Sequence, residues 1–187
     1  MALKPTFSQE VANLLYASHG SPVQSCIQCG TCSATCPAVE FMDHTPRELI
    51  GMISADMKEE VLASNTYWTC ASCYHCTVRC PAQIDIADVM YALKRYSIWR
   101  HQYAEDLIGP VFSSSFVKMI MRTGRSFEPV LAPSYIFKHG PRGVLDEGLM
   151  ATSLLLKGRI PIMPAKIGRV DNFRRMVRRI IPVGGAE

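Results

Sequence analysis

Eight cysteines in two short stretches are the residues of this chain best suited to chemistry. They lie in residues 26–37 and 70–81, and each stretch reads C-x2-C-x2-C-x3-C-P. A cubane iron-sulfur cluster needs four thiolates that converge on one small object, and the C-x2-C-x2-C turn can place three of them around one face. The two motifs use every cysteine in the chain, so no cysteine is left for another role.

The fourth cysteine of each motif, which precedes a proline, predicts a link between the two motifs. In two-cluster ferredoxins of this spacing, that cysteine binds the cluster of the other motif. We therefore expect two [4Fe-4S] clusters, with all eight cysteines as cofactor and metal ligands. The first cluster is assigned to Cys26, Cys29, Cys32 and Cys80, and the second to Cys70, Cys73, Cys76 and Cys36. Such cross-ligation would join the motifs into one unit and hold the clusters close enough for electron transfer.

Three further residues inside the motifs bear on the clusters. Gly30 lets the backbone approach a cluster closely because it lacks a Cβ. His75 and Arg79 lie within the second motif, and a positive charge beside a cluster favours its reduced, more negative state. We expect either an increase in the reduction potential from these two side chains or no role beyond solvation.

Two other uses of eight cysteines are less consistent with the pattern. A disulfide framework suits a short secreted chain, but the N-terminal residues lack an apolar segment and a cleavage site. Zinc suits paired C-x2-C motifs, but it closes a site with four ligands and does not explain three evenly spaced cysteines followed by C-P. Cubane clusters therefore remain the favoured interpretation.

Length, composition and charge limit the remaining possibilities. The chain has 187 residues, of which 48% are hydrophobic and 19% charged, as in ordinary globular proteins. No stretch approaches the roughly 18 uninterrupted apolar residues of a transmembrane helix. Reduced thiols without a secretory signal indicate the cytoplasm. The charge is uneven: residues 1–93 carry 4 Lys/Arg and 9 Asp/Glu, whereas residues 94–187 carry 16 and 7, which gives −5 and +9.

Helical signals around the motifs predict a mainly α fold, an α-helical ferredoxin domain with two cubane clusters over residues 1–104. Ser8 is an expected N-cap for a first short helix, and Thr45-Pro46 with Glu48 forms a capping box that starts a helix continuing to about residue 64. Asp85 is expected to cap a helix after the second motif. The apolar positions of that helix are Ile86, Val89, Met90, Leu93 and Tyr96.

Residues 105–187 predict a basic, helical tail that is interrupted by proline and glycine. Helices are expected over residues 115–122, 145–157 and 172–180. The apolar surface of the tail predicts that it extends along a partner subunit, and a small second helical domain is the alternative. The arginine-rich end does not by itself predict nucleic-acid binding, because no nucleic-acid-binding motif accompanies it.

The second motif and its surroundings resemble the C subunit of heterodisulfide reductase. The resemblance lies in residues 68–81, in the segment Asp88-Val89-Met90-Tyr91-Ala92-Leu93-Lys94-Arg95, and in the tail at residues 124–129 and 154–159. The family includes methanogen enzymes and heterodisulfide-reductase-like complexes of sulfur metabolism. The cysteine motifs alone occur in many ferredoxin-like proteins, so the flanking segments carry the specificity.

The resemblance implies an electron-transfer subunit with two [4Fe-4S] clusters. In that family, it connects a flavin and iron-sulfur subunit to a catalytic subunit that binds unusual clusters through CCG motifs. This chain has no Cys-Cys-Gly and no G-x-G-x-x-G, so disulfide chemistry and dinucleotide binding are expected in other subunits. We expect no catalytic residue here. Two alternatives are the iron-sulfur subunit of a quinone- or membrane-linked oxidoreductase, and a non-redox module in which clusters serve structure or sensing.

Overall fold

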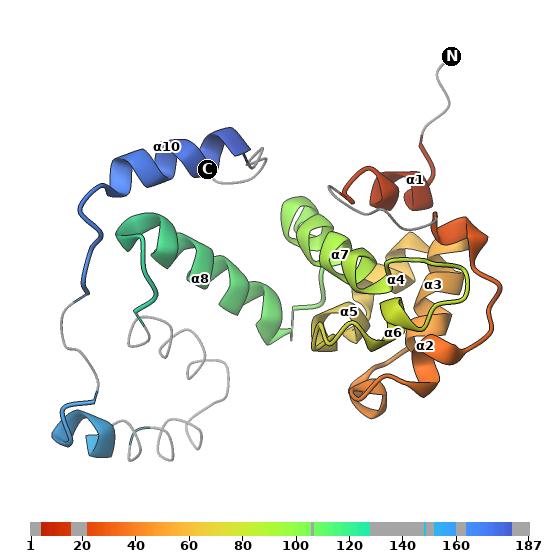
Figure 1. Ribbon diagram of the computed structural model, residues 1–187, viewed down its shortest axis with the longest axis horizontal. Helices are drawn as coiled ribbons and strands as arrows, with labels where there is room; N and C mark the ends of the chain where they lie inside the picture. The colour runs from red at the N-terminus through yellow and green to blue at the C-terminus, as the bar shows by residue number, and fades with distance from the viewer. Residues whose placement is uncertain are drawn as a thin grey trace. The chain divides into compact units, whose positions relative to one another are not determined.

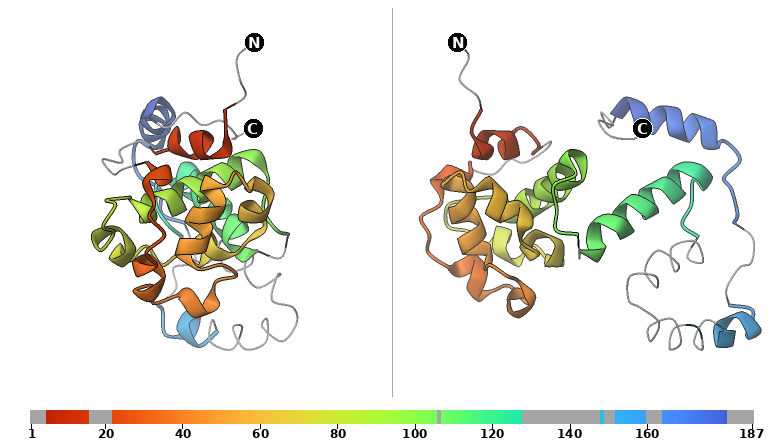
Figure 2. Two further views of the ribbon diagram at one scale, coloured as in Figure 1. Left: turned by 90° about the vertical axis from the view of Figure 1, so that its right-hand side faces the viewer. Right: turned by 180° about the vertical axis from the view of Figure 1, so that it is seen from behind.

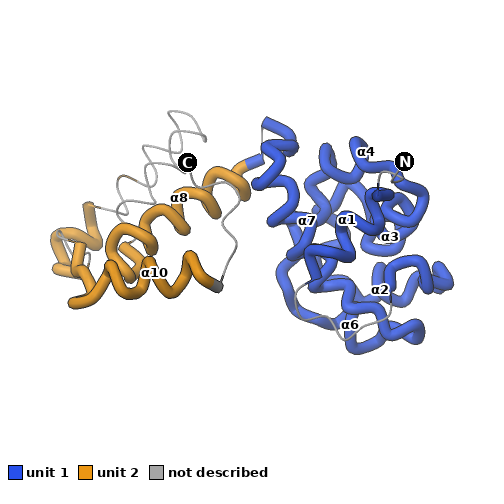
Figure 3. The backbone as a smooth tube through the Cα atoms, turned by 90° about the horizontal axis from the view of Figure 1, so that it is seen from above, with its two compact units in different colours: residues 1–107 blue, residues 108–187 orange. Residues whose placement is uncertain are grey.

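The computed structural model describes residues 5–15, 22–105, 107–127, 148, 152–159 and 164–180. Every regular element in these ranges is a helix, so the predicted mainly α fold is confirmed (Figure 1). The chain divides into two units, residues 1–107 and residues 108–187 (Figure 3). None of the described helices has the length and apolar character that crossing a membrane requires.

The first unit is a set of short helices arranged around one long helix, α7. Two 3-10 turns, η1 and η2, lie at residues 23–25 and 39–41. The helices are α1 (Phe7–Ala12), α2 (Thr31–Ala34), α3 (Pro46–Ser54), α4 (Lys58–Ala63), α5 (Thr66–Thr69), α6 (His75–Val78) and α7 (Ile86–Arg100). Helices α1, α5 and α6 all contact α7.

Helix α7 provides the centre of the hydrophobic core. Its five predicted apolar positions are all buried, and Asp85 occupies the predicted N-cap position. Tyr67, which precedes the second motif, is fully buried in the same core, and its hydroxyl donates to the carbonyl oxygen of Leu62 at 3.0 Å.

The start of α1 differs from the prediction. Thr6, not Ser8, is the N-cap, and it forms a capping box with Gln9. Ser8 is buried within the first turn. The reciprocal hydrogen bonds of Thr6 and Gln9 fix the helix start two residues earlier, and this start directs Phe7 into the core against Tyr96.

The predicted capping box of Thr45 and Glu48 is present, with Pro46 at the first helical position. However, the helix expected to continue to residue 64 is two helices, α3 and α4. Asp56 interrupts it with a left-handed backbone, φ +63°, and accepts a hydrogen bond from the Phe7 amide. The break lets residue 56 anchor α1, a tertiary relationship with no local sequence signal.

The second unit contains two long described helices, α8 (Ile108–Thr123) and α10 (Val170–Ile180), which contact each other (Figure 2). The Arg174 guanidinium donates to the carbonyl oxygens of Met121 and Arg122 at 2.6 and 3.2 Å, and so caps the C-terminal end of α8.

The helices predicted for this half are found in part. Helix α10 matches the prediction for residues 172–180, and α8 extends the prediction for residues 115–122 towards the N-terminus. Pro110 is accommodated in the first turn of α8, where backbone amides have no partner within the helix. The helix predicted over residues 145–157 is helical at 148 and 152–156, and its other residues except Lys157 lie outside the described ranges.

Candidate iron-sulfur site

The two cysteine motifs fold in the same way. In each, the second residue of the first x2 pair and the first residue of the second pair have left-handed backbones. These residues are Gln28 and Gly30 in the first motif, with φ of +57° and +81°, and Ser72 and Tyr74 in the second, with φ of +56° and +61°. A four-residue helix follows in both motifs, α2 and α6, and carries the third cysteine.

These left-handed residues fit an anionic group. Alternation of right- and left-handed backbone turns successive N–H groups to one side, which forms the concave nests found at many iron-sulfur sites. Three of the four positions hold a residue other than glycine, at a cost of about 1–2 kcal/mol each. The sequence analysis singled out only Gly30, for close approach to a cluster, and the residue types at 28, 72 and 74 give no local signal of a left-handed backbone.

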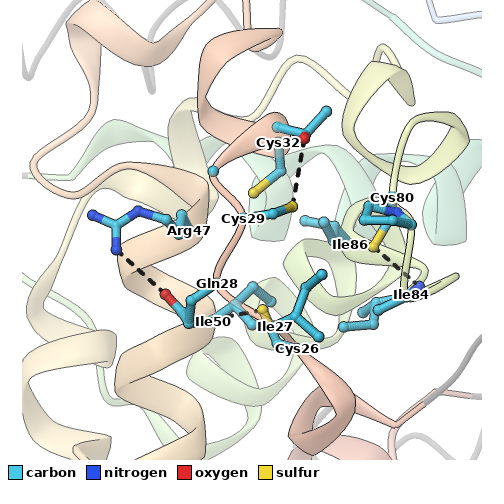
Figure 4. A pocket seen from close by; sticks show the side chains of 14 residues that line it. Cys26, Ile27, Gln28, Cys29, Cys32, Arg47, Ile50, Cys80, Ile84 and Ile86 are labelled. Atoms are coloured by element: carbon cyan, nitrogen blue, oxygen red, sulfur yellow. Dashed lines mark hydrogen bonds between the residues drawn. The ribbon is translucent and has the colours of Figure 1, made fainter.

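The first cavity is surrounded by one of the two predicted cysteine sets. Cys26, Cys29 and Cys32 line it together with Cys80 from the other motif, and Figure 4 shows their sulfurs around one hollow. The space is about 350 Å³ and part of it is open to solvent. Ile50, Ile84 and Ile86 form its apolar wall. The structure thus brings together four cysteines that are up to 54 positions apart in sequence.

The second cavity repeats this arrangement. Its cysteines are Cys70, Cys73, Cys76 and Cys36. The space is about 390 Å³, and its other lining residues are apolar apart from Tyr74. Ala87 and Met90 of α7 form part of the wall. Each fourth cysteine therefore lies in the cavity of the opposite motif, and the contact between α2 and α6 holds the two motifs together.

The described residues contain no ready-made site for a single metal ion. Among the described residues, which include all eight cysteines, no three His, Cys, Asp or Glu side chains are close enough to hold one metal ion. Thiolates bound to zinc at about 2.3 Å would lie about 3.8 Å apart in tetrahedral geometry. A four-iron cube has a metal at each corner and needs its thiolates farther apart than a single zinc ion does.

Hydrogen bonds reach three sulfurs of the first set. The Gln28 amide nitrogen donates to Cys26 Sγ, and the Ile84 backbone amide donates to Cys80 Sγ, both at 3.4 Å. Thr31 Oγ1 lies 3.4 Å from Cys29 Sγ, and this hydroxyl is the main cause of a lowered pKa of the Cys29 thiol. Such contacts stabilise negative charge on sulfur.

Burial has the opposite effect on the third cysteine of each motif. It raises the pKa of the Cys32 thiol, and it raises the pKa of the Cys76 thiol to about 11. A thiolate at either position needs a compensating positive charge, which bound iron would supply in exchange for the thiol proton. The donor set and its surroundings therefore fit iron-sulfur clusters.

The basic residues that line a cavity or contact a motif cysteine differ from those proposed from the sequence. Arg79 and His75 are exposed and line neither cavity. Arg47 of α3 instead lines the first cavity. Lys94 of α7 is half-buried, and its ammonium donates to the carbonyl oxygen of Cys70 at 3.2 Å. Helix-to-motif contacts of this kind depend on tertiary structure and give no signal within the motifs.

Comparison with known proteins identifies the same part of the chain. Residues 22–84 match the 4Fe-4S dicluster domain family. The chain is 32% identical over 87 residues to the C subunit of the H(2):CoB-CoM heterodisulfide,ferredoxin reductase of Methanothermobacter marburgensis. The match covers 46% of this chain and 47% of that protein.

Two further relatives give similar matches. The iron-sulfur C subunit of the CoB--CoM heterodisulfide reductase of Methanopyrus kandleri is 31% identical over 96 residues, 49% of this chain and 50% of the relative. The C subunit of the ferredoxin:CoB-CoM heterodisulfide reductase of Methanosarcina acetivorans is 37% identical over 73 residues, 39% of this chain and 29% of the relative. The chain thus spans half or less of the length of these three curated relatives.

Proposed function

Because this chain is a relative of the heterodisulfide reductase C subunit, and because it carries a 4Fe-4S dicluster domain, we propose that it is the electron-transfer subunit of a heterodisulfide-reductase-like complex. The observation that carries the proposal is the division of the cysteines between two cavities. Cys26, Cys29, Cys32 and Cys80 would hold one [4Fe-4S] cluster, and Cys70, Cys73, Cys76 and Cys36 the other. When bound, such clusters accept and release one electron each.

The residues of this chain would bind, shield and tune the clusters. The eight thiolates hold iron, while Ile50, Ile84 and Ile86 exclude water from one side of the first cavity. The left-handed backbones at Gln28 and Ser72 would turn backbone amides towards a bound cluster. No bond of a substrate is made or broken by these groups, so the role is non-catalytic.

The proposed partners are a subunit with flavin and iron-sulfur clusters, and a catalytic subunit with CCG motifs. The absence of Cys-Cys-Gly and of a dinucleotide fingerprint from this sequence supports a division of labour in which sulfur or disulfide substrates react elsewhere. Cysteine thiols that stay reduced in the cytoplasm fit this assignment. The chain would relay electrons between the two partners.

Residues 105–187 are proposed to dock on a partner subunit. In α8, Phe112 and Phe116 are stacked with ring centroids 6.2 Å apart, and both remain exposed. Val117 beside them is 58% exposed. An apolar strip of this kind is typical of a protein contact surface. The basic charge of this half would favour an acidic partner surface.

Anaerobic affinity purification from the native cell, with mass spectrometry and iron analysis, tests the proposal. We expect a flavoprotein and a CCG-motif protein to copurify with the chain, with about eight irons per chain from two four-iron clusters. Isolation of the chain alone with eight irons would indicate a mobile carrier and overturn the docking role. A membrane protein in place of the CCG-motif partner would favour a quinone-linked oxidoreductase, and clusters that resist reduction would favour a non-redox module.

A further inference from the structure

The two motifs share a backbone, but they differ in the side chains that reach their cysteines. Gln28 and Ser72 occupy the same position of the repeat, with nearly equal φ of +57° and +56°. Thr31 and His75 occupy another equivalent pair of positions. Because the backbones of the two motifs match, any difference in the contacts to their cysteines comes from the side chains.

Hydrogen bonds to the cysteine sulfurs are concentrated on the first cysteine set. Cys26, Cys29 and Cys80 each have a hydrogen-bonding partner at 3.4 Å, in Gln28, Thr31 and the Ile84 amide. The equivalent cysteines of the second set are Cys70, Cys73 and Cys36, and no backbone or side-chain group within the described residues 22–105 makes such a hydrogen bond to their sulfurs. The third cysteines do not contribute to the difference, because a hydroxyl residue directly follows each of them. This residue is Ser33 after Cys32 and Thr77 after Cys76.

Helix α3 fixes the Gln28 amide in its position. Arg47 Nη1 donates to Gln28 Oε1 at 3.4 Å, which leaves the amide nitrogen directed at Cys26 Sγ. Gly51, one turn further along α3, lies against the same amide: a Cβ there would be 3.3 Å from the amide nitrogen. Arg47 and Gly51 thus hold the Gln28 amide in one orientation. Through this amide, the positive charge of Arg47 is connected to Cys26, a proposed ligand of the first cluster.

We propose that Gln28, held by Arg47 and assisted by Thr31, makes the first cluster the one with the higher reduction potential. The inference rests on the proposed function, because it requires both clusters. Hydrogen bonds and positive charge at ligand sulfurs stabilise the reduced, more negative state. The first electron added then resides at the Cys26 set. Transfer of one electron from the second cluster to the first would oxidise the second and reduce the first. With these potentials, the transfer is thermodynamically favourable.

The test is an anaerobic redox titration of the full-length protein with both clusters, followed by electron paramagnetic resonance. The wild type should show two one-electron waves. Gln28→Ser introduces the residue that the second motif tolerates at the same φ, so local folding is preserved. This variant should decrease the equilibrium constant for reduction at the higher-potential wave about tenfold, which lowers its potential by about 59 mV. The potential of the lower wave should not change.

Two more variants make the result decisive. Arg47→Gln removes the positive charge and the hydrogen bond that orients the Gln28 amide. It should also shift the higher-potential wave to a lower potential. Ser72→Ala changes the equivalent position of the second motif, which makes no side-chain bond to sulfur, and should leave the higher wave unchanged. Movement of the lower wave in Gln28→Ser, or of neither wave, overturns the inference.

Iron and acid-labile sulfide are measured on every sample. If the wild type holds two clusters and Gln28→Ser has no effect on the higher wave, only the present inference fails. If the wild type does not bind two four-iron clusters, the proposed function itself fails. The two outcomes are distinguished before any variant is titrated.

Discussion

The side-chain nitrogen of Lys94 lies 3.2 Å from the carbonyl oxygen of Cys70, the first cysteine of the second motif. Lys94 follows Ala87 and Met90 on the face of α7 that lines the second cavity. Burial is the main cause of a lowered Lys94 pKa, and the charge of Cys70 opposes it. In the described part of the chain, no carboxylate forms an ion pair with Lys94. A half-buried cation is stabilised by a nearby anion, which a bound cluster would provide.

Lys94→Met should therefore lower the potential of the second cluster. Removal of a partly desolvated positive charge penalises the reduced state, by about tenfold in the equilibrium constant or about 59 mV. A redox titration should show the lower wave moving down while the higher wave stays. Arg79→Ala is the matched control, because Arg79 is exposed and lines neither cavity. A shift in Arg79→Ala as large as that in Lys94→Met would argue against a local effect.

Cross-ligation makes a prediction about pairs of cysteine variants. Because Cys80 lines the cavity of the first motif, Cys80→Ala should give the same residual spectrum as Cys26→Ala. Cys36→Ala should likewise match Cys70→Ala. Each variant should retain about four irons, since one cubane remains fully ligated. Mössbauer and paramagnetic resonance spectra compare the pairs, and a match of Cys80→Ala with Cys70→Ala would indicate ligation within each motif instead.

The grouping of the cysteines was predicted from two-cluster ferredoxins with the same spacing, in which the fourth cysteine of each motif binds the cluster of the other motif. Helices with strong local signals were likewise predictable: Thr45, Pro46 and Glu48 start α3 as expected. Contacts between distant segments were not predictable. The break at Asp56 exists because that residue binds the Phe7 amide, 49 positions away. Arg47 reaches the first cavity only because α3 packs beside the first motif.

A polar contact between α1, α4 and α7 predicts an acid-dependent stability. The Tyr96 hydroxyl donates to Glu10 at 2.6 Å and is the main cause of the lowered Glu10 pKa, and Lys58 also lies 3.0 Å from that carboxylate. A carboxyl with a lowered pKa stabilises the fold above its ordinary value of 4.5 and loses this contribution as the pH falls through the lowered value.

Glu10→Gln should destabilise the first unit by about 1 kcal/mol at pH 7, a modest value because both charged groups are partly exposed. The difference in unfolding free energy between Glu10→Gln and the wild type should become smaller below pH 4.5. Anaerobic thermal unfolding followed by circular dichroism at several pH values measures it. Glu59→Gln, on the exposed side of α4, is the control and should show no such trend. A difference that stays constant with pH would contradict the ionic origin.

The second unit depends on a close approach at the end of α8. Gly124 has φ +75°, and a Cβ on it would lie 2.3 Å from Ile167 Cδ1. The Ile167 amide donates to the carbonyl oxygen of Thr123 at 3.0 Å, so the segment that carries Ile167 is fixed in place. Gly124→Ala combines backbone strain with a steric clash.

We expect Gly124→Ala to destabilise this unit by more than the roughly 1–2 kcal/mol of a left-handed alanine alone. Gly158→Ala is the matched control, because Gly158 also has a positive φ, +64°, but open space around it. Ile167→Ala removes the clashing Cδ1 and Cγ1 atoms, so the double variant should recover part of the loss, and hydrogen exchange of α8 and α10 measures the cycle. Equal losses of stability in Gly124→Ala and Gly158→Ala, with no stability regained in the double variant, would show that backbone strain alone, without a steric clash, destabilises Gly124→Ala.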